Sequence, residues 1–385
     1  MIPRGPGVPG KSRRWGADLT GWGWRRWVLA GVVVPLVSVA CGFLVGAIAI
    51  LAAGADPNQA YTALLQGAFT NRNAFAETLV STVPYILLGL GVALGFRAGL
   101  FNIGAEGQFY IGSLTGVFIA YSIHGLPGVI EIPLALLAGM AGGFFWASIA
   151  GALKARFGAH EVITTIMLNY ISFLVASYLV DTKGLMLAPN VSTPKTPEID
   201  LNAALPILVP GSRLHLGLIL ALLAIPLVWF LLERTTIGFR LRTVGFNQGT
   251  ARASGISVAR TIVLTMGLSG ALAGSAGIIQ VLGVSHHMTD TVAAGYGFDA
   301  IAVALLARSN PWAVLPAALL FGALHNGASF MQLETQVSAD LISIVQASVI
   351  IFVAAPAIVR WMLRLREAPM ETVHITQREV ETPVA

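Results

Sequence analysis

Residues 261–289 read TIVLTMGLSGALAGSAGIIQVLGVSHHMT and contain no Asp, Glu, Lys or Arg. A helix of about 20 apolar residues crosses the hydrocarbon core of a bilayer, so this block is long enough to span a membrane. Similar blocks recur along the chain, which is 56% hydrophobic and 11% charged. That is more apolar surface than a soluble domain buries. We therefore predict an all-α fold, a polytopic transmembrane helix bundle of about ten spans within residues 28–360.

The positions of the basic residues predict how the bundle is oriented. If ten spans alternate from a cytoplasmic N-terminus, all but four of the 23 Lys and Arg residues lie in inside loops. The four outside are Arg72, Lys183, Lys195 and Arg213. This asymmetry follows the positive-inside rule and predicts cytoplasmic termini, a basic tail of residues 1–27 and a tail of residues 361–385. No basic face is interleaved with exposed aromatic residues, so we predict no nucleic-acid binding.

Several features argue against an enzyme. Cys41 is the only cysteine, and no His, Asp and Glu spacing matches a metal site, so we predict no metal and no cofactor. Residues 5–12, GPGVPGKS, fit the letters of a phosphate-binding loop. A working loop follows a buried strand and opens a helix, whereas only four residues precede this one and two prolines interrupt it. If ATP drives this protein, a partner must hydrolyse it.

Pairs of small residues spaced four apart recur in the apolar blocks, among them Gly112 with Gly116, Gly139 with Gly143 and Gly270 with Gly274. Such pairs let helix backbones approach closely in lipid. We interpret them as sites of ordinary helix packing.

Two polar segments broken by glycine interrupt the apolar pattern, at residues 99–108 and 295–300. Oppositely oriented halves that each carry an interrupted helix are typical of transporters, so we predict inverted-repeat halves. Polar groups inside a membrane are costly unless they face protein, water or substrate. Each segment is therefore either a structural turn or part of a translocation path. The candidate path or gate residues are Asn102, Glu106, Gln108, Asn169, Phe298 and Asp299.

The inner loop of residues 233–260 differs from its surroundings. It is the longest inner loop and combines Arg with Gly, Thr, Asn and apolar residues. A plain connection would not need this length, and the loop offers charged and apolar contacts to a soluble partner. We predict that it docks a motor subunit.

Four motifs together carry a family resemblance. They are GLFNIGAEGQ at residues 99–108, KARFG at 154–158 with HEVI at 160–163, TIGFRLRTVGFN at 236–247 and GYGFDAIAVALL at 295–306. With these motifs the chain resembles the permease subunits of bacterial ABC importers for nucleosides and simple sugars, within the branched-chain amino-acid permease superfamily. Its length resembles that of the larger of two nucleoside permease paralogues. The family tends to show Gly after Leu306, where this chain has Ala307 and Arg308.

The resemblance implies a subunit that forms the path for a nucleoside across the bacterial cell membrane and makes no covalent bond. It implies ABC ATPase subunits, a second permease paralogue or a second copy, and an extracytoplasmic substrate-binding protein as partners. The positions matching the family's ATPase-coupling helix are Arg242, Gly245, Phe246, Asn247, Arg252 and Gly255. Transport of simple sugars or branched-chain amino acids is an alternative. A secondary transporter driven by an ion gradient, with Glu106 or Asp299 as the ion site, is another.

Overall fold

The computed structural model describes residues 33–354, apart from residues 190, 290, 291, 293, 294, 337 and 339. The tails predicted at residues 1–27 and 361–385 lie outside the described residues. Within the described part the regular elements are helices, and an isolated bridge between Ile207 and His215 is the single β pairing. The predicted all-α class is confirmed.

The helices are α2 (Val34–Ala52), α3 (Pro57–Phe69), α4 (Arg72–Arg97), α5 (Ala105–Ser122), α6 (Gly128–Phe157), α7 (Glu161–Asp181), η2 (Leu201–Ala203), α8 (Gly217–Arg234), α9 (Thr236–Phe246), α10 (Gln248–Ala253), α11 (Val258–Gln280), η3 (Val281–Ser285), α12 (Tyr296–Leu306), α13 (Pro311–Thr335) and α14 (Asp340–Ala354). Six segments of the described chain are long and apolar enough to cross a membrane: α4, α6, α7, α8, α13 and α11 with η3. The shorter α2, α12 and α14 are also apolar. A multi-pass membrane protein is therefore indicated, while the number of about ten spans stays a prediction.

Local sequence sets several helix ends. Asn71 caps α4 because its Oδ1 accepts a hydrogen bond from Ala74 N at 2.8 Å. Asn310 caps α13 in the same way, accepting from Trp312 N at 3.1 Å, and Pro311 occupies the first turn, where a missing N–H costs nothing. These caps fix where each chain segment turns back into the bundle.

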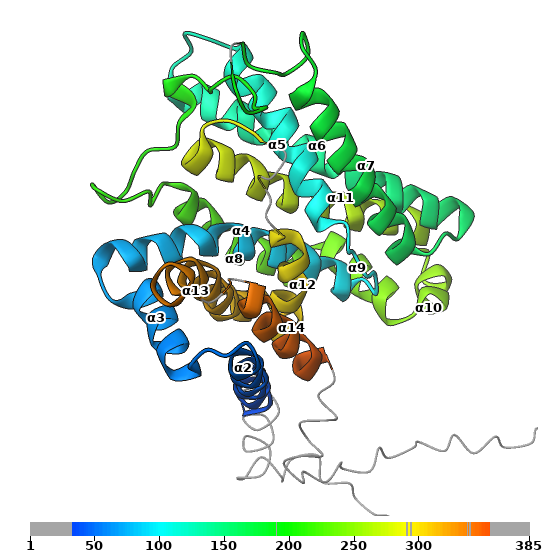
Figure 1. Cartoon of the computed structure of the whole chain (residues 1–385). Helices are drawn as coiled ribbons and strands as arrows, with labels where there is room; N and C mark the ends of the chain where they lie inside the picture. The colour runs from blue at the N-terminus through cyan, green and yellow to red at the C-terminus, as the bar shows by residue number, and fades with distance from the viewer. Residues whose placement is uncertain are drawn as a thin grey trace, which may run out of the picture.

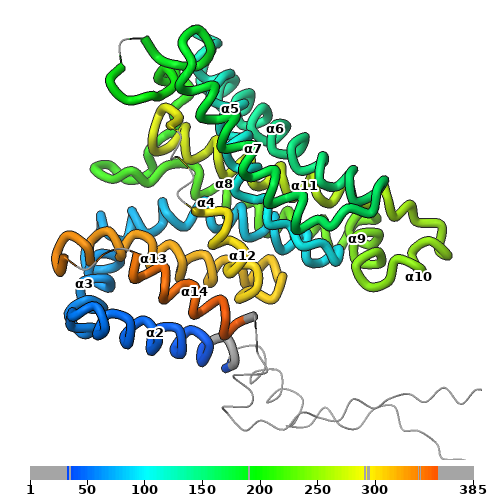
Figure 2. Tube along the Cα trace, turned by 45° about the vertical axis from the view of Figure 1, so that its right-hand side comes forward, coloured from blue at the N-terminus to red at the C-terminus, as the bar shows by residue number. Residues whose placement is uncertain are grey.

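The helices form two groups that meet along α4, as Figure 1 shows from one side and Figure 2 from another. One group contains α5, α6, α7 and α11, and the other contains α2, α3, α13 and α14. Helix α4 contacts both groups and also packs against α8 and α12, and most of its side chains are buried. Helix α7 lies at the periphery and exposes Leu174 and Tyr178. An outer helix with an apolar exposed face suits contact with lipid.

Small residues join α5, α6 and α11. A Cβ atom on Gly274 would lie 2.2 Å from the carbonyl oxygen of Gly139, and one on Gly112 would lie 2.2 Å from the Cα atom of Gly274. Only glycine permits this approach of three backbones. The close packing stabilises helix association in lipid, where the hydrophobic effect does not favour it. The interpretation of these glycine pairs as helix-packing sites agrees with the contacts.

Candidate functional site

The two interrupted segments predicted from the sequence contact each other directly. Glu106 lies in the first turn of α5, and its Oε1 accepts a hydrogen bond from Gly295 N at 3.0 Å. Its Oε2 accepts from Gly297 N at 2.5 Å. The first N–H groups of a helix have no partner within that helix and carry positive partial charge. A buried carboxylate from α5 thus caps the start of α12.

A pair of amides holds the turn between α4 and α5. Asn102 and Gln108 exchange two hydrogen bonds, each 3.0 Å long, and Asn102 Oδ1 also accepts from Gly104 N at 2.9 Å. Asn102 Nδ2 donates to Ser269 Oγ on α11 at 2.9 Å, and Ser269 donates in turn to the Gly91 carbonyl on α4. Because both amides are buried and bonded, they fix the turn against two helices.

Asn169 attaches α7 to the same region. Its Oδ1 accepts a hydrogen bond from Gly107 N at 2.9 Å, and its Nδ2 donates to the Ile103 carbonyl at 2.9 Å. With Asn102, Glu106 and Gln108, it completes a polar cluster around the start of α5, which we call the α5 cluster. In this conformation the α5 cluster bonds protein groups and does not face an open path. Any part that it plays in transport stays a prediction.

The other two candidates, Phe298 and Asp299, lie in a pocket of about 350 Å³. Helices α12, α13 and α14 form its walls, and its polar lining includes His325 and Gln346. Tyr85 on α4 donates to Asp299 Oδ2 at 2.9 Å, while Phe298 is 44% exposed. We call this cavity the α12 pocket. It brings two carboxylates, Asp299 and Asp340, together with an amide, an imidazole and an aromatic ring, beside apolar side chains.

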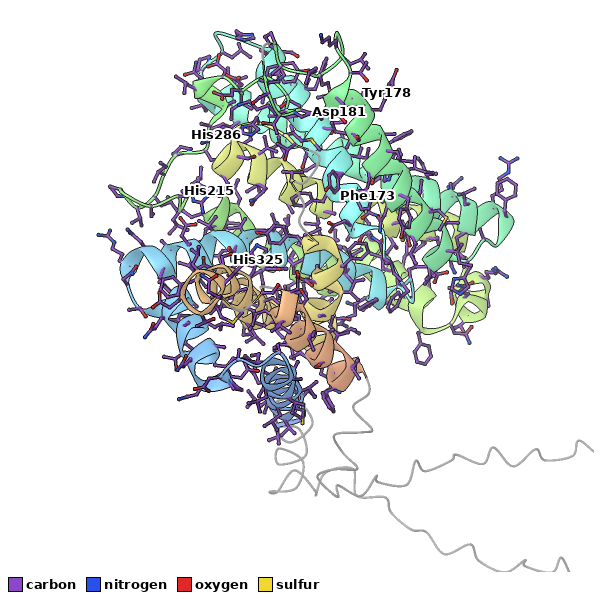
Figure 3. All side chains as sticks on the ribbon, viewed as in Figure 1. Phe173, Tyr178, Asp181, His215, His286 and His325 are labelled. Carbon is purple, nitrogen blue, oxygen red and sulfur yellow. The ribbon has the colours of Figure 1, made fainter. Side chains whose placement is uncertain are left out.

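Sequence reasoning missed the α13 and α14 residues of the α12 pocket. His325 is marked in Figure 3 close to α12, and its Nε2 hydrogen-bonds the Tyr296 hydroxyl at 3.2 Å. Gln346 stands in the apolar run of α14 and is 8% exposed. A polar residue in an apolar helix is a signal of function, but it does not reveal which other helix it faces.

The predicted coupling loop contains two short helices, α9 and α10, joined at Asn247. Asn247 Oδ1 accepts from Thr250 N at 3.0 Å, which caps α10. Phe246 is 92% exposed at the end of α9. Arg252 lies in the last turn of α10, and Gly255 follows the helix in the left-handed region at φ +75°. The loop is an ordered helical pair that presents an aromatic side chain outward.

The coupling loop also packs on the turn that precedes Asn102. Gly245 lies against Arg97 and Ala98 at the end of α4, where a Cβ on Gly245 would come within 2.3 Å of the Arg97 carbonyl oxygen. Glu233 forms ion pairs with Arg97 at 3.6 Å and with Arg242 at 2.7 Å. Helix α9 therefore packs directly on the end of α4 and on the turn into α5.

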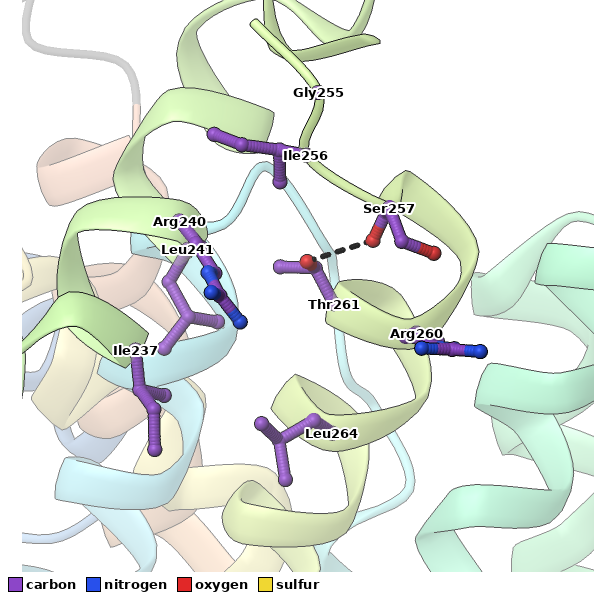
Figure 4. Close-up of a pocket in the computed structure, with 9 residues that line it drawn as sticks. All are labelled: Ile237, Arg240, Leu241, Gly255, Ile256, Ser257, Arg260, Thr261 and Leu264. Atoms are coloured by element: carbon purple, nitrogen blue, oxygen red, sulfur yellow. Dashed lines mark hydrogen bonds between the residues drawn. The ribbon is translucent and has the colours of Figure 1, made fainter.

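A pocket of about 260 Å³ opens between α9 and α11 (Figure 4). Arg240 and Arg260 line it beside the apolar side chains of Ile237 and Leu264. Basic groups at the rim of an apolar hollow suit an acidic and apolar segment of another protein.

These features define a class of protein. The chain is a helical membrane protein whose two interrupted helices meet in its interior, and it carries an ordered basic helical pair on one face. Such an arrangement is typical of a transport protein.

The chain belongs to the family described as branched-chain amino acid transport system / permease component, whose family model matches residues 74–354. It is 41% identical to the guanosine ABC transporter permease protein NupP of Bacillus subtilis, over 87% of this chain and 96% of NupP. It is 36% identical to the nucleoside ABC transporter permease protein NupB of Lactococcus lactis, over 86% and 93%. It is 35% identical to the glucose ABC transporter permease protein TsgB13 of Haloferax volcanii, over 85% and 87%. No solved structure matches the chain.

Proposed function

We propose that this chain is the membrane permease of an ABC importer for nucleosides, powered by separate ATPase subunits. The observation that carries the proposal is the 41% identity to a guanosine permease over nearly the whole of both chains. Nucleosides and glucose share a ring with adjacent hydroxyl groups. The similarity to a glucose permease therefore makes a simple sugar the second candidate substrate.

The proposed machine has further parts. A binding protein delivers the nucleoside outside the cell, and a second permease, a paralogue or another copy, completes the path. The chain lies in the bacterial cell membrane with about ten spans, inverted-repeat halves and cytoplasmic termini. Support comes from the apolar helices, the distribution of Lys and Arg, and the family resemblance.

The proposed mechanism is alternating access driven from the coupling loop. Phe246, Arg252 and the basic pocket beside α9 dock the ATPase. Closure of the ATPase subunits displaces α9, and Gly245 transmits the displacement to the end of α4. The α5 cluster then shifts against the start of α12, which Glu106 caps. Asn102, Gln108 and Asn169 act as gate residues in this scheme, and Phe298 and Asp299 face the path.

Uptake of radiolabelled guanosine tests the proposal in proteoliposomes that contain this chain, its permease partner and the ATPase, with binding protein added outside. We expect ATP-dependent uptake that a hydrolysis-dead ATPase abolishes. Labelled glucose tests the second candidate in the same vesicles. Uptake that persists with the dead ATPase and collapses with an uncoupler would instead establish a secondary transporter.

A further inference from the structure

The α12 pocket has the size and lining of a binding site for a small polar ligand. Its volume of about 350 Å³ lies in the range of small-molecule sites. The polar lining comes from three helices: Asp299 from α12, His325 and Ser329 from α13, and Asp340, Ser343 and Gln346 from α14. Convergent polar side chains in an apolar membrane interior mark a functional site.

We infer that the α12 pocket holds the nucleoside during its passage, with Asp299 accepting hydrogen bonds from the ribose hydroxyl groups and Phe298 packing against the base. This inference rests on the proposed function and names the part of the path that recognises the substrate.

The chemistry of Asp299 fits a vicinal diol. An ionised carboxylate only accepts hydrogen bonds, and its two oxygens match two adjacent hydroxyl donors. The Tyr85 hydroxyl holds Oδ2 at 2.9 Å, which fixes the carboxylate plane while the residue still lines the pocket. A ribose diol has two donors on neighbouring carbons, so the site selects for a feature that all ribonucleosides share.

The position of Phe298 fits a nucleobase. Its ring is 44% exposed although its neighbours Tyr296 and Gly297 are buried. A half-exposed aromatic ring at a pocket wall offers its face to a planar base, and such stacking tolerates any base. Gln346 supplies both donors and an acceptor in the same pocket, so it can bond bases that differ in their edges.

Neighbouring aromatic residues hold Asp299 in place. The rings of Tyr296 and His325 are tilted by 35° with centroids 4.8 Å apart, and Tyr85 packs edge-to-face on Tyr296 at 5.0 Å. The hydroxyl of Tyr296 bonds His325, and the hydroxyl of Tyr85 bonds Asp299. Tyr85 is therefore a positioning residue for Asp299.

The test measures the selectivity of the permease separately from that of the binding protein. The reconstituted complex is supplied with binding protein saturated with labelled guanosine or with labelled 2′,3′-dideoxyguanosine. We expect the wild type to import guanosine at least about tenfold faster, since the analogue lacks both ribose donors. In Asp299→Asn, guanosine uptake should fall about tenfold and the ratio between the two substrates should approach one. Asp181→Asn, an exposed carboxylate at the end of α7, is the matched control.

Two further variants separate recognition from folding. Tyr85→Phe removes the hydroxyl that holds Asp299 but keeps the ring, so selectivity should fall while membrane abundance and thermal unfolding stay close to those of the wild type. Phe298→Leu should raise the KM for guanosine about tenfold. Phe298→Trp, which keeps an aromatic ring, should have a KM close to that of the wild type. Phe145→Leu, which alters an exposed ring on α6, is the control.

The two levels of proposal fail differently. If the wild-type complex imports no nucleoside, the proposed function is overturned. If the wild type imports guanosine, and Asp299→Asn and Phe298→Leu match it in rate and selectivity at equal membrane abundance, the assignment of the α12 pocket is overturned.

Discussion

Glu106 Oε2 accepts a hydrogen bond from Gly297 N at 2.5 Å, across 191 residues of chain. The contact joins the first turn of α5 to the first turn of α12, and Glu106 Oε1 adds a second bond to Gly295 N. One buried carboxylate therefore holds two interrupted helices together. Any change between outward-open and inward-open states has to keep this contact or exchange it for another.

The first prediction replaces the carboxylate with a neutral amide. In Glu106→Gln, one oxygen still accepts a bond, but the charge that faces the α12 start is lost, at a cost of about 1–3 kcal/mol. We expect a lower thermal unfolding midpoint in detergent and slower guanosine uptake. Glu334→Gln, at an exposed carboxylate near the end of α13, should leave both unchanged. Normal stability and uptake in Glu106→Gln would show that the cap is dispensable.

The sequence predicted the break between α4 and α5 closely. The interrupted segment at residues 99–108 contains the end of the turn after Arg97 and the start of α5 at Ala105. Glycines and polar residues identify such a break because both oppose a continuous apolar helix. The charge-free block at residues 261–289 likewise contains most of α11 and all of η3, since charge-free blocks mark helices well.

The pairing of the two breaks could not be predicted in the same way. That Glu106 caps α12 depends on a contact between distant segments, and no local pattern encodes it. Asn102, Gln108 and Asn169 were predicted as candidates from the sequence. Their hydrogen-bond partners were not predicted, for the same reason. His325 and Gln346 were missed because the significance of a polar residue in an apolar helix depends on which helix it faces.

The second prediction concerns Glu233, which bridges Arg97 and Arg242. The three side chains are partly exposed, so Glu233→Ala should change the free energy of unfolding by less than about 1 kcal/mol. Because the bridge links the end of α4 to α9, we expect guanosine uptake to fall about threefold to tenfold while ATP hydrolysis falls less.

The control for Glu233→Ala is Glu198→Ala, which breaks an exposed ion pair with Lys195 outside the coupling loop. Its uptake and ATP hydrolysis should match the wild type. If Glu233→Ala reduces uptake and ATP hydrolysis in equal proportion, the ion pairs support docking and not transmission.

The third prediction tests the exposed ring at the end of α9. Phe246 is 92% exposed in the isolated chain, so Phe246→Ala should not lower the thermal stability of the permease. If the ring docks into the ATPase, its loss should weaken association about tenfold, or about 1.4 kcal/mol. Co-purification, and titration of the ATPase onto the permease in nanodiscs, measure the strength of this association. Phe157→Ala, 73% exposed at the end of α6, is the control, and equal ATPase affinity in both variants would contradict the docking role of Phe246.

The fourth prediction concerns His215, which is buried just before α8. Its Nδ1 accepts a hydrogen bond from Gly217 N at 3.1 Å, and its Nε2 has no hydrogen-bond partner in the described part of the chain. Burial, with a smaller contribution from His286, lowers the pKa of His215 to about 4. The folded protein therefore keeps this imidazole neutral at a pH where the unfolded chain, with a pKa of about 6.5, binds a proton.

The sign of the pH effect follows from that difference in pKa. Above about pH 6.5, His215 is neutral in both the folded and the unfolded state, so its titration does not make the free energy of unfolding depend on pH. As the pH falls from about 6.5 to 4, the unfolded state binds a proton first, and up to about 3 kcal/mol of stability is lost. In His215→Asn, the side-chain oxygen can accept from Gly217 N without titrating, so the unfolding midpoint should fall less between pH 7.5 and 5.5 than in the wild type. His160→Asn, at an exposed histidine, should retain the wild-type slope. If His215→Asn also retains the wild-type slope, the acid sensitivity of the permease arises from groups other than the buried imidazole of His215.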